Sequence, residues 1–187
     1  MTTSFSREET WRLLCEHTAS ASLRTHALAV ESAMRLYARH FGEDEEHWGR
    51  IGLIHDFDYE KHPSAQEHPY VGADILRGLG WPEEDVRCIL SHADYTGVPR
   101  ESLVSRTLFA VDELCGLITA VALVRPSKKV ADVEVKSVRK KMKQKAFAAQ
   151  VNREDIRNGA EVLGLTLDEH IGHVLEALRD NAESLGL

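Results

Sequence analysis

The dipeptide His55-Asp56, within RIGLIHDFDYEKHP at residues 50–63, places two potential metal ligands at the end of an apolar segment. Neutral imidazole nitrogens and ionised carboxylates both bind divalent metals. Neighbouring residues in a helix point about 100° apart, but a helix that unwinds at its last turn can direct both side chains to one ion. We therefore expect His55 and Asp56 to converge at a helix end, with Asp56 placed to bridge towards a second ion.

Four more residues of the same chemistry lie on the apolar faces, or at the ends, of other predicted helices: His26, His68, His92 and Asp112. Buried without a partner, each would cost several kcal/mol or titrate to its neutral form. One or two divalent ions would satisfy all six residues together. A mixed histidine and carboxylate set favours Fe, Mn, Co or Ni over Ca, which prefers oxygen ligands alone.

The elements that must position these residues are predicted to be helices. Aromatic residues make up only 6% of the chain and five prolines interrupt it, which favours an all-α fold. Capping boxes at Ser6 with Glu9 and at Thr166 with Glu169 mark two helix starts. The sequence predicts one domain over residues 1–187, a bundle of about eight helices with the metal site in its core. The core is expected at 20–125, with a basic and C-terminal helical extension at 126–187.

The cysteines and the termini indicate the compartment. The three cysteines, Cys15, Cys88 and Cys115, form no paired motif, so reduced thiols are expected. The N-terminal residues have neither a basic start nor an apolar core typical of a targeting peptide. The most apolar segment, 108–124, carries Asp112 and Glu113 and reads as a buried helix rather than a membrane span. We expect a cytoplasmic protein without a membrane partner.

Charge is distributed unevenly along the chain. Residues 125–145 hold nine Lys or Arg against two acids, a local charge of +7, whereas the whole chain carries −7 and the remainder therefore −14. The overall sign and the lack of interleaved aromatics argue against nucleic-acid binding. The basic segment is either a solvated helix face or a rim that attracts a phosphorylated substrate.

The pattern of these segments resembles the HD superfamily of metal-dependent phosphohydrolases. The resemblance extends over residues 22–115 and is carried by LRTHALAVESAMRLYA, IGLIHDFDYEKHP, EHPYVGADIL, CILSHADY and LFAVDEL. In order and interval these segments are most similar to HD hydrolases of dinucleoside polyphosphates and to HDIG-type proteins. The tail beyond residue 125 resembles a group of HD hydrolases of unassigned substrate.

The resemblance implies a role for each ligand. It assigns one metal to His26, His55, Asp56 and Asp112, and a second metal to branches that also carry the counterparts of His68 and His92. It implies hydrolysis of a nucleotide or another small phosphate ester or anhydride by a metal-activated water, with Asp56 in a catalytic position.

Three further residues are candidates for supporting roles. Asp58 is a catalytic candidate that could hold a water or a ligand histidine, and a solvated loop acid is the alternative. Arg24 lies within one turn of His26 and is a candidate to face a phosphate. FDYEK stands where many relatives have an IGK-like run, so the assisting lysine is absent at its usual offset and Lys61 is the candidate to replace it.

Two other functional classes stay open at this stage. HD-type mixed-valence di-iron oxygenases use nearly the same ligands, and a metal-stabilised binding protein without catalysis would need them too. A homodimer is also compatible with the sequence. His170 and His173 have helical spacing for a shared metal, but no third ligand accompanies them, so we expect a structural role.

Overall fold

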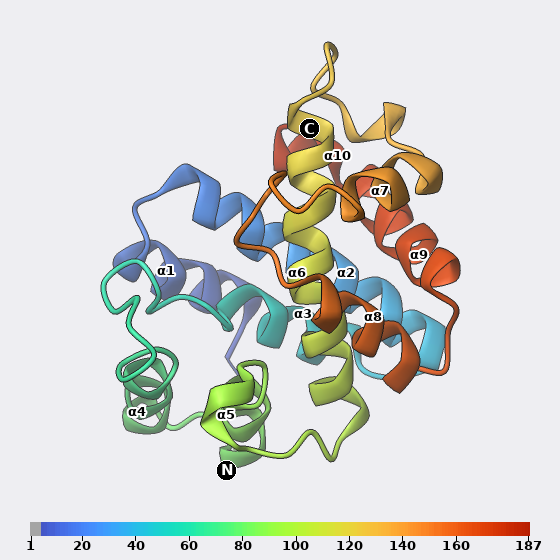
Figure 1. The fold of residues 1–187 in the computed structure, drawn as a ribbon. Coiled ribbons are helices and arrows are strands. Elements are labelled where there is room, and N and C mark those ends of the chain that lie inside the picture. Colours follow the sequence, from blue (N-terminus) through green and yellow to red (C-terminus); the bar gives the residue numbers. More distant parts are fainter. Residues whose placement is uncertain (1–4) are drawn as a thin grey trace.

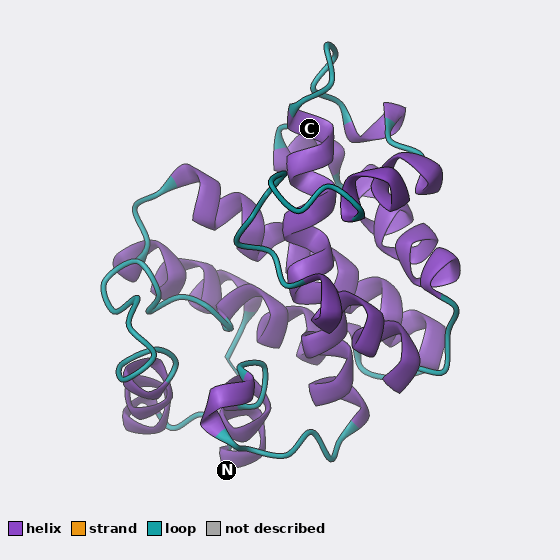
Figure 2. Ribbon diagram, viewed as in Figure 1, coloured by secondary structure: helices purple, strands orange, loops and turns teal. Residues whose placement is uncertain are grey.

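A computed structural model describes residues 5–187, and in that range the chain forms α-helices, two short 3-10 helices and no strand (Figures 1 and 2). The predicted all-α class is confirmed. The first six helices are α1 (Arg7–His17), α2 (Ala21–Phe41), α3 (Glu45–Ile54), α4 (Tyr70–Leu79), α5 (Glu83–Leu90) and α6 (Leu103–Leu123). The next four are α7 (Val135–Met142), α8 (Arg153–Val162), α9 (Leu167–Asp180) and α10 (Ala182–Leu185). Residues 1–4 of the segment judged to lack a targeting signal lie outside the described part.

Local sequence signals account for the helix ends. Ser6 and Glu9 form the predicted capping box at the start of α1, and Thr166 and Glu169 form the one at the start of α9. Helix α2 ends at Gly42, whose φ of 74° is the left-handed conformation that glycine adopts without strain. Residues 5–187 form ten α-helices where about eight were expected, and one of them, α10, is a single turn.

Helix α6 runs through the middle of the molecule and contacts helices on several sides (Figure 1). It packs against α2, α8 and α9, and α2 in turn packs along α3. This arrangement explains why α6 is apolar on nearly every face. Within residues 5–187, no helix combines the length and apolar character that crossing a membrane requires.

The 3-10 helices η1 (Asp94–Thr96) and η2 (Val130–Asp132) lie in two of the longer connections. Helices α4 and α5 lie together at the end of the molecule opposite α7 and α10 (Figure 1). The connection from α3 to α4 spans residues 55–69, and the connection from α5 to α6 spans residues 91–102. These two connections carry the residues that complete the site.

Candidate metal centre

The chain unwinds directly after α3, at the His55-Asp56 dyad. The carbonyls of Ile54, Asp56 and Asp58 accept from the amides three residues later, so turns replace the regular helix. Loss of helical geometry lets neighbouring side chains point to the same side, as expected for a helix that unwinds at its last turn.

The first group of potential ligands consists of His26 from α2, His55 from the end of α3, and Asp112 from α6. The Nε2 atoms of His26 and His55 lie 2.9 Å and 3.4 Å from Oδ1 of Asp112. One potential ligand atom from each residue lies within 4.8 Å of the other two, a spacing that a single ion can span.

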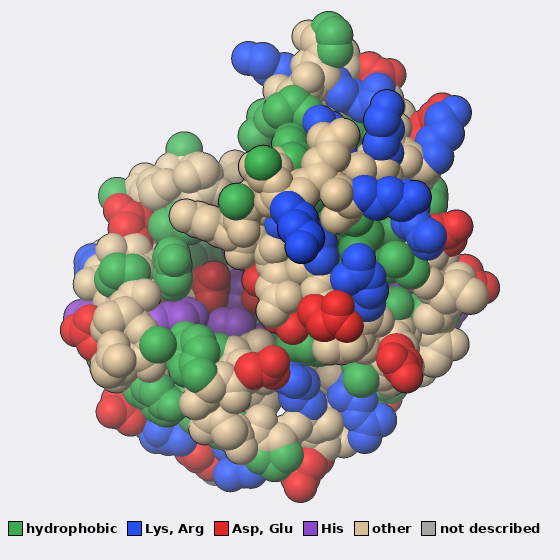
Figure 3. Space-filling model, viewed as in Figure 1, with side chains coloured by type: hydrophobic (Ala, Val, Ile, Leu, Met, Phe, Trp, Pro, Cys, Tyr) green, Lys and Arg blue, Asp and Glu red, His purple; other side chains and the backbone are tan. Residues whose placement is uncertain are grey.

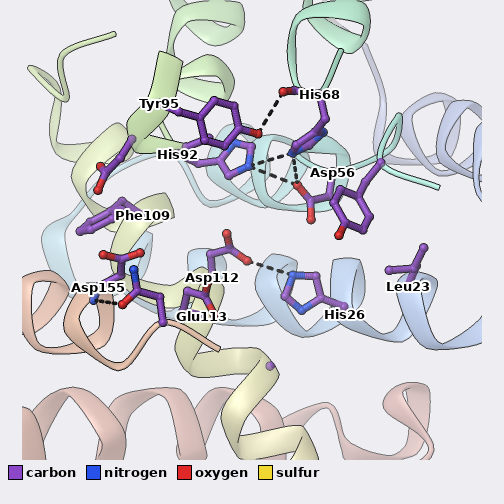
Figure 4. Close-up of a pocket in the computed structure, with 15 residues that line it drawn as sticks. Leu23, His26, Asp56, His68, His92, Tyr95, Phe109, Asp112, Glu113 and Asp155 are labelled. Atoms are coloured by element: carbon purple, nitrogen blue, oxygen red, sulfur yellow. Dashed lines mark hydrogen bonds and ion pairs between the residues drawn. The ribbon is translucent and has the colours of Figure 1, made fainter. Parts of the chain in front are cut away.

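The second group consists of Asp56, His68 from the approach to α4, and His92 from the end of α5. Oδ1 of Asp56 lies 3.2 Å from Nε2 of His68 and 3.2 Å from Nε2 of His92. The same oxygen lies 3.6 Å from Nε2 of His55, a member of the first group. Asp56 therefore stands between the two groups (Figure 4).

The histidines are oriented by hydrogen bonds through their other ring nitrogen. Nδ1 of His55 donates to the carbonyl of Gly52 at 2.7 Å, and Nδ1 of His92 donates to the carbonyl of Ile89 at 2.6 Å. A carbonyl oxygen only accepts, so in the neutral ring the proton sits on Nδ1 and Nε2 keeps its lone pair. Metal ligands need this tautomer.

Two buried polar atoms at the centre, Nε2 of His55 and Oδ1 of Asp56, form no hydrogen bond of good geometry, although imidazole nitrogens and carboxylate oxygens lie 3.2–3.6 Å from them. The His55 side chain is fully buried, so water outside the molecule does not satisfy its nitrogen. An unpaired buried polar atom is costly, and here one is an imidazole lone pair and the other a carboxylate oxygen. The donor set thus fits one or two divalent cations held by His26, His55, Asp112, Asp56, His68 and His92.

The charges at the centre perturb the ionisation of its members. Burial lowers the pKa of His68, but the carboxylates of Asp56 and Asp58 outweigh it and raise that pKa to about 9. Burial raises the pKa of Asp56, yet the neighbouring His55 and the other imidazoles hold it well below its usual range. The protein alone therefore compensates these carboxylates with protons on imidazoles, and a bound cation would replace those protons.

A pocket of about 460 Å³ opens onto both groups (Figures 3 and 4). Its lining includes five of the six potential ligands, all except His55. It also contains five carboxylates, two of which are the ligands Asp56 and Asp112. The complete lining is Leu23, His26, Asp56, Tyr59, His68, His92, Ala93, Asp94, Tyr95, Phe109, Asp112, Glu113, Gly116, Asn152 and Asp155. Within the described part of the chain, that lining contains no Lys or Arg. No residue of the basic segment 125–145 lines this pocket, which favours the alternative of a solvated surface for that segment. Figure 3 shows Lys and Arg side chains gathered on the α7 side of the molecule, away from the histidines of the pocket.

Asp58, a catalytic candidate in the sequence, is buried and does not line the pocket. One carboxylate oxygen lies 2.8 Å from Nδ1 of His68 and the other accepts the Gly72 amide at 2.7 Å. A Cβ atom at Gly72 would lie 2.8 Å from the Asp58 carboxyl carbon, so glycine permits this close approach. Asp58 thus orients His68, one of the two alternatives considered, and is no solvated loop acid.

The two residues predicted to bind substrate have other partners. The Arg24 guanidinium donates to the carbonyls of Thr18 and Cys15, and the Lys61 ammonium donates to the carbonyl of Glu16. These carbonyls belong to the C-terminal end of α1, where cations and donors stabilise a helix. Neither side chain lines the pocket, so the fold does not bring them to the ligand groups.

His170 and His173 do not join either group of potential ligands in the described residues. His170 is buried between α2 and α6, where its Nδ1 lies 2.6 Å from the Tyr37 hydroxyl and its Nε2 lies 2.8 Å from the Ala110 carbonyl. This is the placement of a structural histidine.

Several pocket residues were not identified from the sequence. Tyr95 donates its hydroxyl to the His68 carbonyl at 3.0 Å, and the Tyr59 ring lies edge-on to His68 at 5.2 Å. Glu113 follows Asp112 directly in an apolar helix, and a second carboxylate at that position is a signal that could identify it from the sequence. Asp155 gave no signal, because its place depends on how α8 packs.

Comparison with known proteins yields one match. The family model described as HD domain matches residues 23–117, about half of the chain and all six potential ligands. No curated protein matches. No solved structure matches either.

Proposed function

The chain belongs to the HD domain family, and on that basis we propose that it is a metal-dependent phosphohydrolase of a small phosphate ester or anhydride. The family is one of metal-dependent, hydrolase-type domains, and its members bind divalent metals. The finer statement, hydrolysis of a phosphate substrate at these residues, is the proposal. One observation carries it: two groups of histidine and carboxylate ligands share one pocket and are linked by Asp56.

The chain's own residues fix the geometry that such a reaction needs. His55 and His92 present Nε2 because backbone carbonyls hold their Nδ1 protons, and His68 is held by Asp58. Asp56 lies between the imidazoles of both groups. Divalent ions in such a site supply Lewis acidity, which makes water nucleophilic near neutral pH and polarises phosphoryl oxygens.

The pocket limits the size of the substrate. A volume of about 460 Å³ falls at the smaller end of the usual range of ligand sites, roughly 300–1,000 Å³. Tyr59 and Tyr95 stand at its edge with exposed fractions of 40% and 52%, so the entrance stays open to solvent. A small phosphorylated molecule fits this space better than a long polymer.

Phosphate release from purified, metal-reconstituted protein tests the proposal. Stripped protein is loaded separately with Fe, Mn, Co or Ni and offered nucleotides and simple phosphate esters without oxygen. We expect phosphate release with at least one metal, and its loss in Asp56→Ala. Asp74→Ala is the matched control, because the Asp74 side chain is 80% exposed and lies outside both groups.

Oxygen uptake under reducing conditions separates the rival enzyme class. Phosphate release in the absence of oxygen supports hydrolysis. Turnover that requires oxygen, with no phosphate released anaerobically, would contradict the proposal and favour an oxygenase. Phosphate release that survives Asp56→Ala would contradict the assignment of the reaction to this site.

A further inference from the structure

Helix α8 lies unusually close to α6, in a register that two contacts define. A Cβ atom built at Gly159 would lie 2.6 Å from the Cα atom of Ala110, closer than real side chains approach. One at Gly116 would lie 3.9 Å from a methyl group of Val151, just before α8. Residue 159 lies beside residue 110 and residue 151 beside residue 116, so the α8 segment runs antiparallel to α6. Glycine at position 159 permits the close crossing because it has no Cβ atom.

This register brings two carboxylates together at the wall of the pocket. Glu113 follows Ala110 by one helical turn, and Asp155 precedes Gly159 by one turn, so they share the faces that meet. Both residues line the pocket and both are partly buried. Figure 4 shows Glu113 and Asp155 on the opposite side of the pocket from His68 and His92, with Asp112 between them.

Neither carboxylate has a cation of the protein as its partner. In residues 5–187, Glu113 and Asp155 form no ion pair and belong to neither group of potential metal ligands. The third acid on this wall is different, because Asp94 pairs with Arg100, whose guanidinium also stacks 3.7 Å above the Phe109 ring. Arg100 is thus already paired with Asp94, and no Lys or Arg of the described residues pairs with Glu113 or Asp155.

We infer that Glu113 and Asp155 form a subsite for a cationic group of the substrate, an ammonium carried by a small phosphate ester. The inference rests on the proposed function and deepens it. The phosphate of such a molecule would face the metal ligands, and its ammonium would face the two carboxylates across the pocket. Charge-assisted hydrogen bonds of this kind are about twice as strong as neutral ones.

Two other ligands could be considered beside Glu113 and Asp155, a polyphosphate chain and a further metal ion, and the charge and number of the carboxylates argue against both. A polyphosphate chain would extend further negative charge towards Glu113 and Asp155, where like charges repel. A further metal ion would need more ligand atoms close together than these two carboxylates provide. The structure therefore favours aminoalkyl phosphates over the nucleotides that the resemblance suggested.

Matched pairs of substrates test the inference directly. Metal-loaded protein is offered short ω-aminoalkyl phosphates and the hydroxyalkyl phosphates of the same chain length, which differ by an ammonium in place of a hydroxyl. Phosphate release gives kcat/KM, and calorimetry gives equilibrium binding independently of turnover. We expect a preference for the amine of about tenfold in both readouts.

Variants assign the preference to the two carboxylates. The double variant Glu113→Gln with Asp155→Asn should bind the two members of each pair equally, because neither neutral side chain favours an ammonium over a hydroxyl. The matched control is Glu154→Gln, beside Asp155 but 68% exposed and paired with Arg157, which should keep the full preference. Metal content measured on each variant shows that the ligand groups are intact.

The two readouts separate failure of the inference from failure of the proposed function. Hydrolysis of both esters with equal efficiency would overturn the cationic subsite and leave the phosphohydrolase standing. Preferential binding of the amine without any phosphate release would uphold the subsite and remove the hydrolase. A preference that survives in the double variant would overturn the assignment to Glu113 and Asp155.

Discussion

Two buried histidines, His55 at the metal centre and His170 in the helical core, have the same exposure and opposite surroundings. Both are fully buried. His170 has a partner for each ring nitrogen, Tyr37 and Ala110, whereas His55 has one for Nδ1 only, the Gly52 carbonyl. A buried histidine whose two ring nitrogens both have partners within the fold has a structural role. A buried histidine with a partner for only one nitrogen marks the place of a ligand.

The ionisation of the two rings follows from the same difference. Burial lowers the pKa of His170 to about 4, with no carboxylate close enough to oppose it. Burial also lowers the pKa of His55, but the charges of Asp56 and Asp112 outweigh it and raise that pKa above its ordinary value. Carboxylates gathered at one place thus attract cations there, whether protons or metal ions.

The largest expected effect concerns His55 and tests whether the centre around it binds a metal ion. A divalent ion at 1,000 times its dissociation constant should stabilise the protein by about 4 kcal/mol, because it binds only the folded chain. For a chain of this size that is a rise in Tm of about 10 °C. Scanning calorimetry with Mn and with chelator measures it.

The control for that shift is another partly exposed histidine. His26→Ala removes a ligand whose side chain is 22% exposed, and it should abolish most of the shift. His62→Ala removes a histidine that is 30% exposed and pairs with Glu67 outside the groups, and it should change nothing. Equal shifts in both variants would mean that the ion binds elsewhere.

The next effect concerns His170 and the pH dependence of its contribution to the free energy of unfolding. His170 has a folded pKa of about 4 and an unfolded pKa near 6.5, so the unfolded chain binds more protons between these values. Its contribution is complete above pH 6.5 and is lost as pH falls to 4, amounting to about 3 kcal/mol.

Urea unfolding of the wild type and His170→Gln, both with chelator, isolates this contribution. The wild type should lose stability relative to the variant as pH falls from 6.5 to 4, because protonation of the other histidines affects both proteins alike. Parallel pH profiles would show that His170 is not held neutral, and the contrast with His55 would fail.

A smaller effect is expected at the residue that orients His68. Asp58→Asn keeps an acceptor for the Gly72 amide but removes the charge beside Nδ1 of His68. Loss of such an orienting carboxylate typically lowers metal affinity about 10- to 100-fold. Competition with a metal indicator measures it, and Asp74→Asn at an exposed position is the control. Unchanged affinity would show that His68 needs no orientation by Asp58.

The smallest effect separates a structural role of Arg24 from the substrate-binding role that its sequence position suggested. Arg24→Gln removes charged donors from the end of α1 and should cost about 1 kcal/mol of unfolding free energy. The KM for any phosphate substrate should stay unchanged. A large rise in KM at unaltered stability would restore the substrate-binding role.

The sequence was informative where function depends on residue type and order. Six histidine and aspartate residues on apolar helix faces or at helix ends predicted a shared centre. The caps at Ser6 and Thr166 predicted two helix starts, and the structure has both. The capping signals are local in sequence. The shared centre was predictable because apolar helix faces are buried against one another.

The rest depended on long-range packing that no spacing reveals. Asp58 became an orienting residue only because Gly72 lets the chain approach within hydrogen-bond distance. Asp155 reached the pocket only because Gly159 lets α8 press against Ala110. Arg24 lies near His26 in sequence, yet its long side chain reaches back to α1, which sequence distance alone does not predict.

The number of ions bound per chain tests the central claim most directly. Elemental analysis of protein reconstituted with Mn or Fe should find up to two ions per chain, one for each group of ligands. Asp56→Asn, which keeps the shape of the side chain joining the groups, should lower that number or weaken binding sharply. The same stoichiometry and affinity in Asp56→Asn as in the wild type would contradict the account.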